Sequence, residues 1–187
     1  MLTTEEVTRA VDRALQILEL SGNKNLRRLL LEIARTESGR NPKGTAEYTH
    51  HSANPFQLTN IAIKQTQGSN RLRSDRKKID KNSTLKNPWA YQSAEEIKSN
   101  VKMNALAGLL YVREILKRFN LTVPASLKSR GELWKRYYNT SSGAGDSEHY
   151  ITKNKSRLYE VIILEALEPK QSDKSLQLIR EYINFSF

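Results

Sequence analysis

The stretch that decides the fold is KNLRRLLLEIARTESG, residues 24–39. Its apolar residues recur at spacings of three and four, which places them on one face of an α-helix. Gly39 follows the last turn and predicts the end of this helix. The stretch therefore predicts an amphipathic helix that packs against a core. The apolar face consists of Leu26, Leu29, Leu30, Ile33 and Ala34.

The helical period continues through most of the chain, so the expected fold class is mostly α. Two Ser/Thr-x-x-Glu patterns, Thr3 with Glu6 and Ser93 with Glu96, predict capping boxes at helix starts. Residues 41–54 are polar and predict a loop or a short irregular hairpin, whereas 68–89 show no sustained period and predict a long basic loop. Helices are expected over about 3–18, 24–37, 56–66, 93–119, 129–138, 147–167 and 173–185.

Length and composition predict one basic domain with an anionic partner. The chain has 187 residues, 31 Lys and Arg against 20 Asp and Glu, a net charge of +11 and no cysteine. Disulfides and thiolate metal sites are therefore excluded. The longest apolar run, 105–112, is too short to span a bilayer, and the acidic segment 1–15 does not resemble a signal peptide. A strong positive balance favours anionic polymers as partners.

Glu37 is the most informative single residue. It lies seven, four and three positions after Leu30, Ile33 and Ala34, so it continues the apolar face at the C-terminal end of the helix. Partial desolvation and the negative end of the helix dipole both disfavour a carboxylate there. A carboxylic acid that stays protonated is what general-acid attack on a glycosidic oxygen needs. The alternative is that Glu37 points outward into solvent, as most glutamates do.

Three further segments place this glutamate in a pattern. Glu37-Ser38-Gly39 is followed by SANPFQL at 52–58, then by Tyr137-Tyr138-Asn139 and a glycine-containing loop at 143–145. In order and separation, residues 26–150 resemble the lysozyme-like lytic transglycosylases, the peptidoglycan-cleaving domains of bacteriophages and secretion systems. The resemblance implies a mostly α, two-lobed lysozyme-like fold with a saccharide cleft. It also implies a catalytic domain over 1–168 and an accessory C-terminal helix over 169–187.

The resemblance also implies a reaction and a role for each matching residue. The enzyme would cleave the β-1,4 bond between N-acetylmuramic acid and N-acetylglucosamine, be phage-encoded, serve cell-wall degradation, and need no metal or cofactor. Glu37 would protonate the leaving oxygen and then act as base, and Ser38 would orient it. The cleft residues implied by the match are Phe56, Gln57, Tyr138 and Asn139.

The match departs from the family pattern in the residues that precede Gln57. Asn54 stands where the family has glycine, and Pro55 stands where an aliphatic residue is usual. Because asparagine tolerates positive φ better than most residues, the backbone of the segment can survive the exchange.

Two other functions remain open from the sequence. Glu47 lies ten residues after Glu37 and could position an attacking water, which would make the protein a hydrolytic lysozyme with two carboxylates. The alternative from another class is a non-catalytic basic protein that binds nucleic acid or a virion. Residues 64–86 hold eight basic and two acidic residues, a net charge of +6. This segment suits the anionic cell wall, nucleic acid or only solvent.

Partners and location follow from the peptidoglycan interpretation. Peptidoglycan glycan strands are the expected partner, together with virion or secretion-machine proteins, and nucleic acid is the less favoured one. Without a signal peptide, the protein is expected in the virion, or in the host cytoplasm with delivery to the periplasm and cell wall. His50-His51 lacks the spacing of a zinc site, so no metal is expected.

Overall fold

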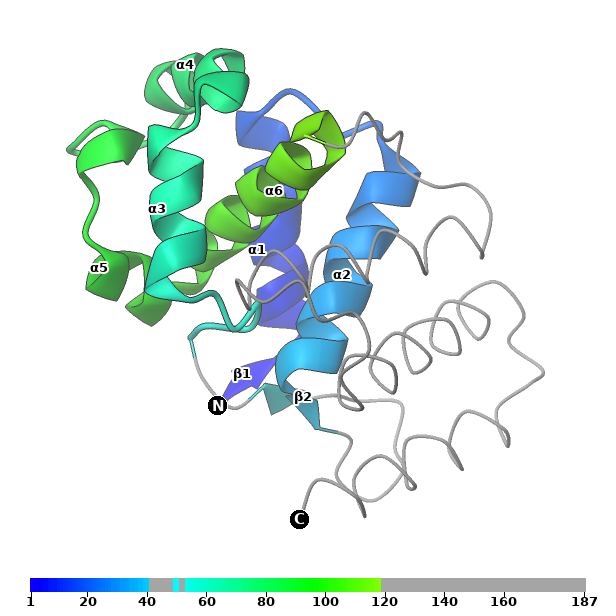
Figure 1. Cartoon of the computed structure of the whole chain (residues 1–187). Coiled ribbons are helices and arrows are strands. Elements are labelled where there is room, and N and C mark those ends of the chain that lie inside the picture. Colours follow the sequence, from blue (N-terminus) through cyan, green and yellow to red (C-terminus); the bar gives the residue numbers. More distant parts are fainter. Residues whose placement is uncertain (41–48, 51–52, 119–187) are drawn as a thin grey trace, which may run out of the picture. The chain divides into compact units, whose positions relative to one another are not determined.

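The computed structural model describes residues 1–40, 49–50 and 53–118 (Figure 1). The chain divides into two units, Met1–Asn120 and Leu121–Phe187. The expected helices beyond residue 120, the expected domain end at 168 and the accessory helix over 169–187 all lie outside the described residues.

The first two helices form as the sequence predicts. Helix α1 (Thr4–Ile17) begins at the Thr3 capping box, in which the Glu6 amide donates to the Thr3 hydroxyl at 3.2 Å and the Thr3 amide to the Glu6 carboxylate at 2.7 Å. Helix α2 (Lys24–Ser38) begins at Asn23, whose side chain accepts from the Leu26 amide at 3.0 Å. Both helices bury their apolar faces, and α1 packs against α2.

Gly39 ends α2, as the sequence predicts, but without a left-handed backbone. Its backbone is extended, with φ −70° and ψ 135°. A Cβ atom at this position would collide with the carbonyl oxygen of Arg35. Close backbone approach, and not positive φ, therefore favours glycine here.

A small antiparallel sheet follows α2. Strand β2 (Gly39–Arg40) pairs antiparallel with β3 (Thr49–His50), with Gly39 opposite His50. The sequence left a loop or a short hairpin open over 41–54, and residues 41–48 lie outside the described part of the chain. Strand β1 (Leu2–Thr3), which the sequence did not indicate, pairs with the other side of β3. The order β1-β3-β2 ties the start of α1 to the end of α2.

Two expectations between residues 56 and 89 are wrong. Helix α3 (Asn60–Gly68) begins four residues later than expected, because Thr59 caps it through the Ala62 amide. The expected basic loop contains the 3₁₀ helix η2 (Asn70–Leu72), helix α4 (Arg73–Asn82) and the 3₁₀ helix η3 (Trp89–Tyr91). Helix α4 buries only Asp75 and Ile79, so it shows almost no apolar period.

The expected long helix after Ser93 is two helices. The Ser93 capping box is confirmed, but α5 (Ala94–Ser99) ends at Asn100, whose backbone is extended. The Asn100 carboxamide oxygen then accepts from the amides of Lys102 and Met103 at 3.0 and 3.2 Å, which caps α6 (Val101–Arg118).

Helix α6 is the centre of the described unit. All of its residues from Asn104 to Val112 are buried, as expected for a helix surrounded on every side. It packs against α1, α3, α5 and η2, as Figure 1 shows for the helices around it. No helix within the described ranges has the length and apolar character needed to cross a membrane.

Candidate active site

Glu37 is the penultimate residue of α2 and is half-buried. The residues that precede it on the same helix face, Leu30, Ile33 and Ala34, are fully buried. Glu37 is therefore the last residue on the core-facing side of α2. This position lies between the two alternatives that the sequence allowed, because the side chain is neither in the core nor fully in solvent.

Ser38, the next residue, fastens the end of α2 to the sheet. Its hydroxyl is 4% exposed, donates to the Ala34 carbonyl at 3.1 Å and lies 2.7 Å from Nδ1 of His50. The Ser38 hydroxyl and the His50 ring therefore share a hydrogen bond whose direction depends on the histidine tautomer. His50 is itself 2% exposed. The histidine that the sequence treated as a polar loop residue is thus a buried link between β3 and the residue beside Glu37.

Asn54 closes a turn over residues 54–58. Its backbone carbonyl accepts from the Gln57 amide at 3.0 Å, and its side-chain oxygen accepts from the Leu58 amide at 3.0 Å. Asn54 and His50 are four residues apart, so their Cα atoms lie within about 14 Å of each other. The turn therefore begins within that distance of the strand that holds Ser38.

The turn is attached to α6 by a fully buried side chain. The Asn104 carboxamide donates to the Asn54 side-chain oxygen at 2.6 Å and accepts from the Phe56 amide at 3.2 Å. One helical turn later, Gly108 leaves room for the Phe56 ring, which would lie 2.6 Å from a Cβ atom there. The absence of a side chain at Gly108 therefore allows the close approach of an aromatic ring.

Phe56 therefore has a packing function in this structure. Its side chain is 1% exposed, so the expected cleft-lining contact between its ring and a sugar does not fit its position. The apolar ring anchors the turn, and its successor in the chain faces solvent.

Gln57 is the exposed residue of the turn and has a left-handed backbone, with φ 48°. The sequence placed the tolerance for positive φ at Asn54, but among the described non-glycine residues only Glu19 and Gln57 have it. A left-handed backbone costs a residue with a side chain about 1–2 kcal/mol. Strain of this kind is concentrated at functional sites. The side-chain amide of Gln57 donates to the Asn54 carbonyl at 2.9 Å, which holds it beside the turn.

Three expected site residues, Glu47, Tyr138 and Asn139, lie outside the described residues. The structure thus connects Ser38 to His50, Gln57 to Asn54 and Phe56 to Asn104. That the expected site residues meet in one cleft stays a prediction. Sequence reasoning missed His50 and Asn104 as supports. Asn104 sits on the apolar stripe of α6, and a polar residue on such a stripe is the signal that could have found it.

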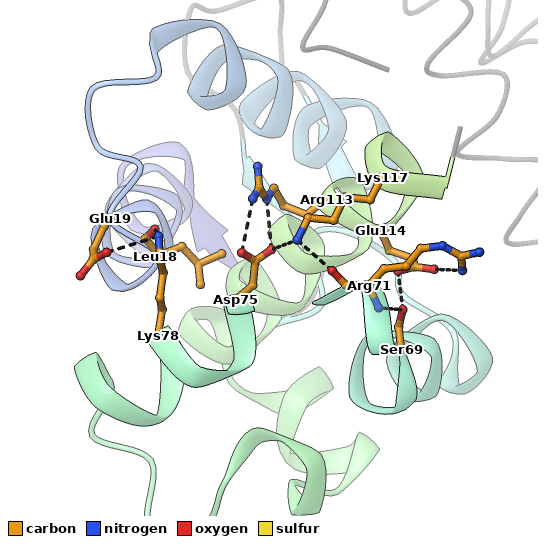
Figure 2. Close-up of polar contacts among 9 residues, drawn as sticks. All are labelled: Leu18, Glu19, Ser69, Arg71, Asp75, Lys78, Arg113, Glu114 and Lys117. Carbon is orange, nitrogen blue, oxygen red and sulfur yellow. Dashed lines mark hydrogen bonds and ion pairs between the residues drawn. The ribbon is translucent and has the colours of Figure 1, made fainter. Parts of the chain in front are cut away.

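Two buried carboxylates, Asp75 and Glu114, make further polar contacts with residues of η2, α4 and α6 (Figure 2). Asp75 of α4 accepts from the Arg113 guanidinium at 3.1 and 3.3 Å, and Lys117 lies 3.5 Å away. Glu114 accepts from the Ser69 hydroxyl at 2.6 Å and also has two cationic neighbours. These are Arg71 at 3.4 Å and Arg118 at 2.9 Å. No sequence pattern indicates that these two acids are buried.

The described residues contain no group of three or more His, Cys, Asp or Glu side chains able to hold a metal. No protein-family model matches the chain, and no curated protein or solved structure matches it either. The function of this chain therefore has to be inferred from its own residues.

Proposed function

We propose that this chain is a lytic transglycosylase with a lysozyme-like fold, which cleaves the glycan strands of peptidoglycan with Glu37 as its acid and base. The observation that carries the proposal is the position of Glu37, a half-buried residue at the end of the apolar face of α2. Partial removal from water is the environment in which a carboxyl group serves as a general acid. The order of the Glu37, Gln57 and Asn139 segments along the chain supports the same assignment.

The proposed reaction needs one carboxyl group. Glu37 protonates the glycosidic oxygen between N-acetylmuramic acid and N-acetylglucosamine, and the carbon–oxygen bond breaks. The resulting carboxylate then takes the proton from the sugar's own C6 hydroxyl, whose oxygen attacks the anomeric carbon. The product is a 1,6-anhydro sugar, and no water is consumed.

The supporting residues have distinct proposed tasks. Ser38 positions Glu37, because its hydroxyl is fixed by Ala34 and His50. Gln57 offers an exposed carboxamide to the saccharide from a turn that Asn104 holds in place. Tyr138 and Asn139 would add a hydroxyl and an amide, as the family resemblance implies.

The decisive experiment is product analysis by mass spectrometry after incubation with purified peptidoglycan. We expect anhydro-muropeptides from the parent protein and none from Glu37→Gln. Glu95→Gln is the matched control, since Glu95 is exposed in the first turn of α5. Equal cleavage by Glu37→Gln would refute the assignment of the acid. Products that carry an added water, lost in Glu47→Gln, would establish the hydrolytic lysozyme instead.

One observation favours a second function, a non-catalytic basic protein that binds anionic polymers. Arg73, Lys77 and Lys81 are exposed and follow each other at i, i+4 and i+8 along α4, so they share one face. A row of cations of this kind suits a polyanion such as nucleic acid. Binding to duplex DNA that weakens steeply with salt, together with no cleavage of peptidoglycan, would favour this function.

A further inference from the structure

Asn54, which stands where the family that the chain resembles has glycine, builds its turn with its side chain. Its backbone is not left-handed, since Glu19 and Gln57 are the only described residues other than glycine with positive φ. Its carboxamide instead accepts from the Leu58 amide at 3.0 Å and donates to the Leu58 carbonyl at 3.3 Å. A glycine at this position would make neither bond. Asparagine therefore adds side-chain support to the turn and does not serve a left-handed backbone.

The carboxamide of Asn104 completes this arrangement from α6. It donates to the Asn54 side-chain oxygen at 2.6 Å and accepts from the Phe56 backbone amide at 3.2 Å. Asn104 is 0% exposed, so bulk water cannot replace either bond. Loss of one partner would leave buried polar groups unsatisfied, which costs more than the bond itself contributes. The two carboxamides therefore fix the turn to α6 as one hydrogen-bonded unit.

The unit acts on Gln57, the exposed residue at the end of the turn. The left-handed backbone of Gln57, with φ 48°, is strained and persists only where its surroundings fix it. The Asn54 carbonyl accepts from the Gln57 backbone amide at 3.0 Å and from its side-chain amide at 2.9 Å. Both bonds end on the residue that Asn104 holds. A displacement of Asn54 would therefore also displace the Gln57 carboxamide.

We infer that Asn54 and Asn104 form a positioning pair, which holds the Gln57 carboxamide in the orientation that receives a saccharide. The inference rests on the proposed function, in which Gln57 contacts the glycan strand. Asn104 is buried and cannot touch a saccharide itself, so its effect passes through Asn54 to Gln57. The pair should therefore influence glycan binding only while the Gln57 side chain is present.

The first measurement needs no saccharide. It is the mobility of the Gln57 side-chain amide in the full chain, from the heteronuclear NOE of its nitrogen. We expect a rigid carboxamide in the parent and a mobile one in Asn54→Gly and in Asn104→Asp, where an oxygen replaces the donor that faces Asn54. Asn25→Asp, the same change at an exposed residue in the first turn of α2, should match the parent. A carboxamide that stays rigid in Asn54→Gly would overturn the pair, even if Asn104→Asp fails to fold.

The second measurement is a double-variant cycle on the binding of soluble, peptide-free glycan strands. All variants carry Glu37→Gln, so that strands are bound and not cleaved. Asn54→Gly and Gln57→Ala should each weaken binding by about tenfold, roughly the contribution of one hydrogen bond. The two changes together should weaken it no more than Gln57→Ala does alone.

The cycle separates a positioning role from a merely structural one. Losses that multiply would show that Asn54 acts on the fold and not through Gln57, and would overturn the pair while the proposed function stands. A parent chain that neither binds nor cleaves glycan strands would refute the proposed function and with it the saccharide role. The NOE measurement would then still decide whether the two asparagines position Gln57.

Discussion

Replacement of Gly108 by alanine tests how the candidate site is built. The added Cβ atom would lie 2.6, 2.7 and 2.9 Å from three atoms of the Phe56 ring. Carbon atoms in contact prefer about 3.5–4.0 Å, so the ring would have to move by about 1 Å. The ring is 1% exposed, and its own backbone amide is held by Asn104 on the same helix, so little free space is available for that movement.

The expected cost follows from two opposing contributions. Overpacking a core typically costs about 1–3 kcal/mol, and the trapped ring favours the upper half of that range. Alanine regains about 0.5–1 kcal/mol over glycine in a helix. We therefore expect Gly108→Ala to lose about 1–2 kcal/mol of unfolding free energy. At 2–4 °C per kcal/mol, this lowers the melting temperature by about 2–8 °C.

The assay is thermal and urea unfolding of matched variants. Gly22→Ala is the control, because nothing lies within 4 Å of its Cβ position, and its stability should change by less than about 0.5 kcal/mol. Phe56→Leu should relieve the clash, so the double variant should show a favourable coupling of at least about 0.5 kcal/mol. If Gly108→Ala is as stable as the parent, or if the two changes are additive, the proposed contact is not tight.

Three further predictions concern other parts of the described unit. Gln57→Gly should be more stable than Gln57→Ala by about 1 kcal/mol in urea unfolding, because glycine adopts positive φ without strain; equal stabilities would contradict a strained turn. Asp75→Asn should lose about 2–3 kcal/mol by leaving two cations without their buried partner, whereas the exposed Asp80→Asn should lose almost nothing. Hydrogen bonds from Ser93, first from its backbone amide and second from its hydroxyl, lower the pKa of Glu96. The ionised Glu96 therefore stabilises the fold above the ordinary pKa of a glutamate, and this stabilisation is lost as pH falls through the lowered pKa. Glu96→Gln should therefore unfold earlier than the parent at neutral pH and equally at a pH below that pKa; a difference that persists in acid would refute this origin.

Local signals explain which parts of the fold the sequence predicted well. The capping boxes at Thr3 and Ser93 involve residues three apart, so the sequence contains both partners of each. The end of α2 was likewise visible, because the apolar period stops where Gly39 follows. These features depend on neighbours along the chain and need no knowledge of the tertiary structure.

The errors arise where the stabilising partner is distant in the sequence. The apolar period runs without interruption from Ile97 through Val101 to Ala105, so it cannot reveal that Asn100 breaks the helix. Helix α4 was missed because part of its buried face is the carboxylate of Asp75, whose partner Arg113 lies on another helix. Patterns based on apolar residues do not register a buried ion pair.

The candidate site divides in the same way. Periodicity placed Glu37 at the end of the apolar face of α2, where the structure has it half-buried. The supports His50 and Asn104 act across gaps of 12 and 48 residues, on Ser38 and on the Phe56 amide. Both partners of each contact are brought together by the fold. The sequence marks Asn104 only as a polar residue on an apolar stripe, and it does not name the residue that Asn104 binds.

The structure also changes what the positive charge means. In the basic segment 64–86, Arg71 pairs with the buried Glu114, and Lys78 pairs with Glu19. Part of the positive charge of this segment therefore neutralises acids of the protein itself and is not available to an external polyanion. The exposed cations that remain on α4, Arg73, Lys77 and Lys81, repel each other along one helix face. Such a row of like charges weakens the isolated helix. An anionic partner bound to this face would relieve the repulsion, which is the physical reason to expect such a partner here.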